Sequence, residues 1–197
     1  MQTFLISDLH LGHNSATTFK RFDGKPLRNF ANSEEMDEAI VQTINSVVKP
    51  KDRLYICGDV AIKRSALATI GRINGRKVLI RGNHDIFKLN DYIPYFDDVR
   101  GSHKLDNYII SHIPIHIQSL ARWCDGNIHG HIHYNWVGEG YSESRPMDTA
   151  DLNYFNVSCE LLRYKPIEFS ELKKVHKLLR ERGTWTISDI CKTMELS

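Results

Sequence analysis

A short apolar run that ends in a polar turn is the feature that most constrains this chain. The aliphatic run 78–80 is followed directly by Gly82, Asn83, His84 and Asp85. Such a run is typical of a buried parallel strand, and its turn then lies at the carboxyl edge of a sheet, where open α/β proteins bind ligands. An amide, an imidazole and a carboxylate in succession offer a neutral oxygen ligand, a proton donor and an orienting group.

The same pattern recurs along the chain and predicts the fold class. Apolar runs alternate with segments of helical periodicity, and this alternation predicts an α/β protein with a parallel sheet and right-handed crossovers. A hairpin from Val99 to Ser111, turning near residues 106–107, is expected to follow. The other expected strands lie at 3–6, 53–57, 78–80, 127–129, 154–159 and 164–169, and the expected helices at 33–50, 63–73 and 170–183.

Composition limits the class of protein. The 197 residues are 41% hydrophobic and 25% charged, which fits one globular domain. With 26 basic and 24 acidic residues the net charge is +2, so no global field attracts a polyanion and any nucleic-acid contact must be local. The four cysteines form no CxxC pair and are expected to be reduced. Without a leader or an apolar span, the expected protein is cytoplasmic and has no membrane partner.

Side chains that ligate metal ions follow five of the expected strands. Residues this far apart in sequence become neighbours only if their strands share a sheet edge, which the alternation independently predicts. Carboxylate, imidazole and amide ligands suit divalent ions such as Mn, Fe, Zn, Ni or Mg, and one carboxylate can bridge two ions about 3.5–4 Å apart. The residues are Asp8 with His10, Asp59, Asn83 with His84, His112, and His131 with His133.

Each motif alone is a weak signal, but their order is specific. Asp8 and His10 by themselves are more often a surface loop in which the Asp caps a turn. Together, the motifs DxH, GD, GNHD, SH and GHxH resemble those of the calcineurin-like metallophosphoesterases, in order from Asp8 to His133. The resemblance implies a four-layer α/β/β/α sandwich and a dinuclear metal centre that hydrolyses phosphate esters. Ser111 departs from it, because many members have glycine before that histidine.

The resemblance also implies a role for each residue. His84 would be the catalytic imidazole. Independently of the resemblance, the adjoining carboxylate of Asp85 is expected to hold the His84 ring in place. The two divalent ions are expected to be Mn, with Fe, Zn, Ni or Mg as alternatives. One ion would bind Asp8, His10 and His133, the other Asn83, His112 and His131, and Asp59 would bridge them.

The expected chemistry is hydrolysis of a phosphomonoester or phosphodiester. Two divalent ions neutralise phosphate oxygens and acidify a bridging water, so hydroxide is available for in-line attack. His84 then stabilises the developing charge or protonates the leaving oxygen. A small phosphorylated substrate of nucleotide type is favoured, but such a site contacts phosphate rather than the leaving group. A nuclease acting on RNA or DNA, and a non-catalytic metal-binding scaffold, stay open as alternatives.

Residues outside the motifs support weaker hypotheses. His13 and Arg145 are candidate phosphate contacts, each with a surface role as the alternative. The long loop 14–32 either flanks the mouth of the site or is a solvated face. His103 and His176 are expected at the surface, and the basic helix 172–182 is expected to be solvated rather than a nucleic-acid contact. The phosphoesterase domain is expected over 1–169, with a helical extension over 170–197 packed on or flanking it; the oligomeric state is undetermined.

Overall fold

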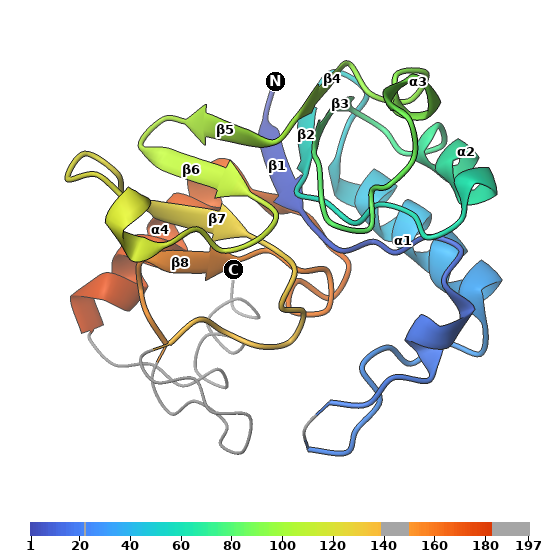
Figure 1. The fold of residues 1–197 in the computed structure, drawn as a ribbon, viewed down its shortest axis with the longest axis horizontal. Coiled ribbons are helices and arrows are strands. Elements are labelled where there is room, and N and C mark those ends of the chain that lie inside the picture. The colour runs from blue at the N-terminus through green and yellow to red at the C-terminus, as the bar shows by residue number, and fades with distance from the viewer. Residues whose placement is uncertain (22, 139–149, 183–197) are drawn as a thin grey trace.

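The structure, a computed structural model, describes residues 1–21, 23–138 and 150–182. It is an α/β protein with two mostly parallel sheets and few helices (Figure 1). The first sheet has the strand order β4-β3-β2-β1-β9, and the second has the order β5-β6-β7-β8. The predicted α/β class with a parallel sheet is therefore confirmed. Arg145 and the tail 183–197 lie outside the described residues.

The first sheet is built from the apolar runs that the sequence marks as strands. Four strands run parallel, and β9 pairs with β1 in the antiparallel direction. Their central side chains, among them Leu5, Leu54 and Leu79, are fully buried. Burial of each such side chain contributes about 1.5–3 kcal/mol. The strands are β1 (Thr3–Ile6), β2 (Arg53–Ile56), β3 (Arg76–Ile80), β4 (Asp98–Arg100) and β9 (Ile167–Glu168).

The helices begin and end close to their sequence signals. The side chain of Asn32, one residue before the expected start, caps α1 by accepting a hydrogen bond from the N–H of Glu35 at 2.8 Å. The helix expected over 63–73 is shorter, and a one-turn helix, α3, was not expected. The helices are α1 (Ser33–Val47), α2 (Leu67–Ile70), α3 (Leu89–Tyr92) and α4 (Phe169–Arg182), with 3-10 turns at Asn14–Thr17, Arg64–Ala66 and Ile117–Ser119.

The second sheet contains the expected hairpin, but the hairpin is shorter than expected. It consists of β5 (Ser102–Leu105) and β6 (Tyr108–Ser111), whereas Val99 belongs to β4 of the first sheet. The chain therefore crosses from one sheet to the other at Gly101. The parallel strands β7 (Gly126–His129) and β8 (Tyr154–Asn156) follow β6.

The helix α4 shows that one histidine was placed wrongly from sequence. His176 is 1% exposed rather than at the surface. Tyr108 Oη lies 2.9 Å from its Nδ1, and its Nε2 donates to the carbonyl of Leu152 at 2.7 Å. His176 therefore anchors α4 on the second sheet.

The two sheets meet where their parallel strands end. The N–H of Ser7, just after β1, donates to the carbonyl of Val157 at 2.9 Å, and the N–H of Cys159 donates back to Ser7 at 2.9 Å. This bridge joins the carboxyl end of β1 to the segment after β8. The side chains that follow the strands of both sheets are thereby gathered at one place. None of the described helices has the length and apolar character to cross a membrane, and the described cysteines are free thiols.

Candidate metal centre

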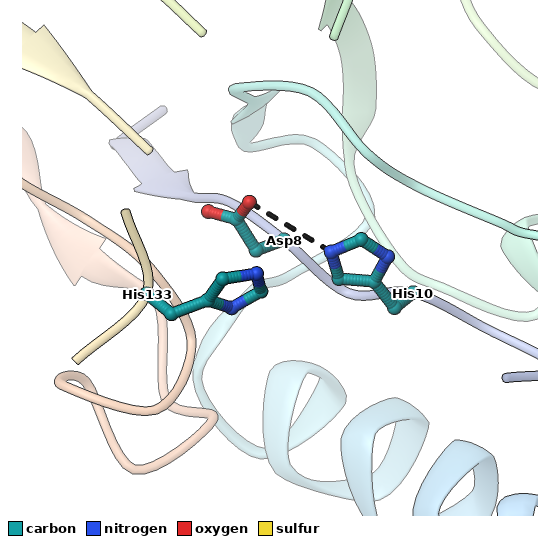
Figure 2. A group of neighbouring side chains, drawn as sticks. All are labelled: Asp8, His10 and His133. Atoms are coloured by element: carbon teal, nitrogen blue, oxygen red, sulfur yellow. Dashed lines mark ion pairs between the residues drawn. The ribbon is translucent and has the colours of Figure 1, made fainter. Parts of the chain in front are cut away.

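Two clusters of metal-ligating side chains form where the sheets meet. The first cluster is Asp8, His10 and His133, and the second cluster is Asp59, His112 and His131. In each cluster one ligand atom per residue lies within 4.8 Å of the others. Figure 2 shows the first cluster, in which Asp8 and His10 come from the loop after β1 and His133 from the segment after β7. His10 Nε2 lies 3.9 Å from Asp8 Oδ1.

Asp59 contacts both clusters through a single oxygen. Its Oδ2 lies 3.3 Å from His112 Nε2 in the second cluster and 3.7 Å from His10 Nε2 in the first. Its other oxygen, Oδ1, accepts a hydrogen bond from the N–H of His84 at 2.8 Å. Burial raises the pKa of Asp59, but the hydrogen bond with His112, the charges of His112 and His10 and the hydrogen bond from the N–H of His84 together outweigh burial and lower the pKa to about 2. A carboxylate that is charged and lies between two ligand groups has the position that a bridging ligand needs.

The hydrogen bonds of His112 point its Nε2 into the second cluster. His112 Nδ1 donates to the carbonyl of Cys57 at 2.9 Å, and this contact fixes the ring orientation. Nε2 then faces the side-chain oxygen of Asn83 at 2.9 Å as well as Asp59. The His112 Nε2, the amide oxygen of Asn83 and the Asp59 Oδ2 therefore converge on one point. Three electron-rich atoms can lie this close only with a proton or a cation among them. Asn83 therefore lies with the second cluster.

His10 gives an independent test of whether a metal ion fits. Its side chain is 4% exposed, and neither ring nitrogen has a hydrogen-bond partner in the described part of the chain. Burial lowers the pKa of His10 to about 3, so the ring is neutral, as a metal ligand must be. A buried unpaired polar group costs roughly 1–3 kcal/mol. A divalent ion coordinated by His10 would remove that cost, and the residues present therefore fit a metal ion.

The backbone at the two clusters is in an unusual conformation. Non-glycine residues with positive φ are rare, because Cβ crowds the carbonyl, and each costs roughly 1–2 kcal/mol. Five of the six cluster members are in this conformation, and only His112 follows its strand regularly. Such strain is concentrated at functional sites in proteins. The five are Asp8 (φ 60), His10 (φ 50), Asp59 (φ 55), His131 (φ 73) and His133 (φ 50).

Two motif glycines let the chain approach the ligands closely. A Cβ at Gly82 would collide with the Asp59 carboxylate, and a Cβ at Gly130 would collide with Ser7 and the Asp8 carboxylate. The glycines of GNHD and GHxH are therefore required by close packing around the acids.

Asp85 has different partners from those expected. It is 2% exposed, and its carboxylate accepts hydrogen bonds from the N–H groups of Asp59 at 2.9 Å, Val60 at 3.0 Å and Gly82 at 2.8 Å. Its oxygens thus hold the backbone that carries Asp59. This corrects the expectation that Asp85 orients the His84 ring.

His84 and His13 lie at the solvent side of the first cluster. His84 is exposed, and its ring centroid is 5.6 Å from that of His10. His13 is half-buried, with its ring 5.7 Å from His10 and 5.5 Å from Phe19. Both imidazoles are therefore close enough to meet a ligand at the centre. Arg145, the other candidate phosphate contact, is not among the described residues.

A buried ion pair behind the first cluster was missed from sequence. Arg28 is 1% exposed and Glu160 is 8% exposed. Arg28 Nε donates to Glu160 Oε1 at 2.8 Å, and the same oxygen lies 3.0 Å from His133 Nδ1. Burial raises the pKa of Glu160, but the Arg28 cation together with the hydrogen bond and charge of His133 outweighs burial and lowers the pKa to about 2.

The long loop around Arg28 explains why the pair was missed. Arg28 also donates to the carbonyls of Asp8 and Leu9. The loop was expected to flank the mouth or to be solvated, yet this arginine points inward. Nothing in the sequence singles out Glu160, because it belongs to none of the ligand motifs.

Fold and site together define an α/β protein with two His/Asp clusters suited to metal ions at the junction of its sheets. The chain belongs to the family of the uncharacterized protein MJ1445 of Methanocaldococcus jannaschii, to which it is 30% identical over 194 residues, 95% of this chain and 97% of the relative. The gene 66 protein of Mycobacterium phage L5 is 38% identical over 89 residues, 42% of this chain and 39% of that protein. No family model matches the chain.

A solved structure supports the fold. AQ665 from Aquifex aeolicus, a protein of unknown function, matches with a TM-score of 0.59 and 25% identity over 88% of this chain and 98% of its own. An archaeal phosphodiesterase matches with a TM-score of 0.42 and 14% identity over 80% of this chain and 82% of its own. The second likeness is too distant to carry an inference.

Proposed function

We propose that the protein is a phosphoesterase that works with two divalent metal ions, in the manner of the calcineurin-like metallophosphoesterases that its motifs resemble. The observation that carries this proposal is Asp59, whose Oδ2 lies 3.7 Å from His10 and 3.3 Å from His112. One charged carboxylate between two groups of ligands is what a dinuclear centre requires. The four-layer arrangement of that family and Mn as the native ion are part of the proposal.

The ligands would be divided as the two clusters are. One ion would be held by Asp8, His10 and His133. The other ion would be held by His112, His131 and Asn83, and Asp59 would contribute to both. When bound, the ions would supply positive charge against the phosphate oxygens and activate the attacking water.

The proposed chemistry of the chain itself centres on His84. The backbone N–H of His84 donates a hydrogen bond to Asp59. Its side chain is exposed beside His10 and can reach a substrate. A protonated His84 would stabilise charge on the transferred phosphoryl group or give its proton to the leaving oxygen. His13, whose ring lies 5.7 Å from that of His10, would contact a non-bridging phosphate oxygen.

The substrate we favour is a small phosphate ester of nucleotide type. The net charge of +2 gives no broad field for a long polyanion. A nuclease acting on RNA or DNA is the second candidate, because its metal site would be the same. A non-catalytic scaffold is disfavoured, since a chain that had lost its chemistry would not need His84 beside a complete ligand set.

Metal removal tests the proposal. We expect the purified protein to contain two divalent ions per chain and to hydrolyse bis-p-nitrophenyl phosphate. A chelator should abolish turnover, and Mn should restore it. Turnover that persists in metal-free protein would refute the proposal. A panel of nucleoside monophosphates, cyclic nucleotides, dinucleoside polyphosphates and short RNA or DNA, assayed with Mn, then separates the substrate classes.

A further inference from the structure

A group of basic side chains lies at the end of the first sheet opposite to the metal centre. β2 begins with Arg53 and β3 with Arg76, and the two residues pair in register. Residues paired in register project to the same face of the sheet, so their side chains are neighbours. Like charges at paired positions repel each other. Among the residues that the structure describes, neither guanidinium takes part in an ion pair.

These two arginines line a cavity of about 170 Å³. A second wall is an aromatic pair, in which the His103 ring stacks on the Tyr55 ring at 5.4 Å between centroids and 17° between planes. His103 belongs to β5, and Arg100, which also lines the cavity, ends β4. The cavity therefore lies where the chain crosses between the sheets, from β4 to β5.

The acids around the cavity leave it with a positive charge. Arg100 Nε donates to Asp98 Oδ2 at 2.6 Å, so Asp98 compensates Arg100. The one other carboxylate among the lining residues is Asp97, which is exposed. Arg53 and Arg76 thus share at most one acid between them. An anion held by both guanidinium groups would complete the charge balance and replace repulsion by attraction.

We propose that this cavity binds a phosphate group, either inorganic phosphate or the phosphate of a small monoester, between Arg53 and Arg76. Guanidinium groups present parallel N–H donors that match phosphate oxygens in a bidentate way. The site is separate from the metal centre, because both arginines stand at the amino ends of strands whose carboxyl ends carry the metal ligands. The four residues of β2 alone span about 10 Å.

A phosphate titration of metal-free protein tests this site without involving the metal centre. The full chain is treated with a chelator, dialysed and heated at increasing inorganic phosphate, with chloride added to hold the ionic strength constant. We expect a saturable rise of the Tm, because binding to the folded state alone stabilises it. The double variant Arg53→Gln/Arg76→Gln should bind phosphate about ten-fold more weakly or worse, since it loses charge-assisted hydrogen bonds.

A matched variant separates this site from general charge effects. Arg122 is exposed on the connection between β6 and β7, so Arg122→Gln changes the charge without touching the cavity and should keep the full response. Equilibrium dialysis with labelled phosphate gives a second measurement that needs no unfolding. An equal response of the double variant and the unmodified chain, or an equal response to chloride, would overturn the proposal.

A nucleoside 5′-monophosphate distinguishes the two sources of phosphate. A Tm rise with the monophosphate that is lost in the double variant identifies a phosphate ester as ligand, and a rise with inorganic phosphate alone identifies the free anion. Because all measurements use metal-free protein, their outcome is independent of the phosphoesterase activity proposed above.

Discussion

The two clusters of the metal centre are supported in different ways. The first cluster rests on a buried ion pair, since Glu160 is shared by Arg28 and His133 at 2.8 Å and 3.0 Å. The second cluster is held by the backbone, because His112 donates to a main-chain carbonyl and Asp85 accepts from the N–H groups around Asp59. The first is supported by charge and the second by local chain geometry.

This difference concerns how firmly each cluster would hold an ion, because the two clusters are equally buried. Asp8 and His10 are 0% and 4% exposed in the first cluster, and Asp59 and His112 are 2% and 3% exposed in the second. The exposed neighbours are Asn83, which lies with the second cluster, and His84, whose ring lies beside His10 of the first cluster. An anionic partner makes a ligating imidazole more basic and fixes its orientation. We therefore infer that the first cluster would hold an ion more tightly, and that a substrate would enter beside the exposed Asn83 and His84.

The largest effect is expected at Asp59, the residue common to both clusters. Asp59→Asn should lower the metal content at both positions and abolish turnover, because two ions about 4 Å apart would then repel without a shared anion. His10→Ala is the matched contrast and should empty mainly the first cluster. Elemental analysis of the purified variants measures both. If Asp59→Asn kept the full metal content of the unmodified protein, Asp59 would not be the bridging ligand.

A smaller effect, on turnover alone, is expected at His84. His84→Ala should fold and keep both ions but lose about 10²–10⁴-fold in turnover if the imidazole transfers a proton. The loss should be smaller for p-nitrophenyl esters than for nucleoside esters, because a good leaving group needs little protonation. His116→Ala, at the exposed histidine that caps the 3-10 turn Ile117–Ser119, is the control. If turnover fell by the same small factor for both ester types, the role of His84 would be structural.

The smallest functional effect is expected behind the first cluster. Glu160→Gln should weaken the ion at His133 by about 10–100-fold and leave the ion at His112 in place. It also leaves Arg28 buried without its anion, which should lower the free energy of unfolding by about 3–5 kcal/mol. Metal titrations and urea unfolding measure the two effects.

Glu181→Gln serves as the control for Glu160→Gln. Glu181 forms an exposed pair with Lys177 on α4, and such pairs contribute about 0–1 kcal/mol. If Glu160→Gln weakened both ions equally, the two clusters would not differ in their support as we infer.

The sequence by itself determined where most strands lie and which polar residues follow them, although the strands expected over 154–159 and 164–169 are shorter. Apolar runs separated by helical periodicity fix strand order along the chain, because each run must bury its side chains in a sheet. The ligand set is also local information, since each candidate lies a few residues after its run. Asp8, Asp59 and His131 are therefore identifiable from the sequence alone. The same reasoning placed the turn of the β5–β6 hairpin correctly at residues 106–107.

Only the tertiary structure decided what surrounds those residues. Arg28 and Glu160 are 132 residues apart, and neither carries a local signal that one compensates the other. Likewise, the sequence predicts Val99 in a hairpin strand, but Val99 pairs with β3. It also predicts His176 at the surface, but His176 is buried where α4 packs on the second sheet. Asp85 looked like a partner of its neighbour His84 and instead binds the backbone of Asp59. Local pattern encodes which face of an element is apolar, whereas the partner of a buried charge depends on contacts that form only when distant segments pack together.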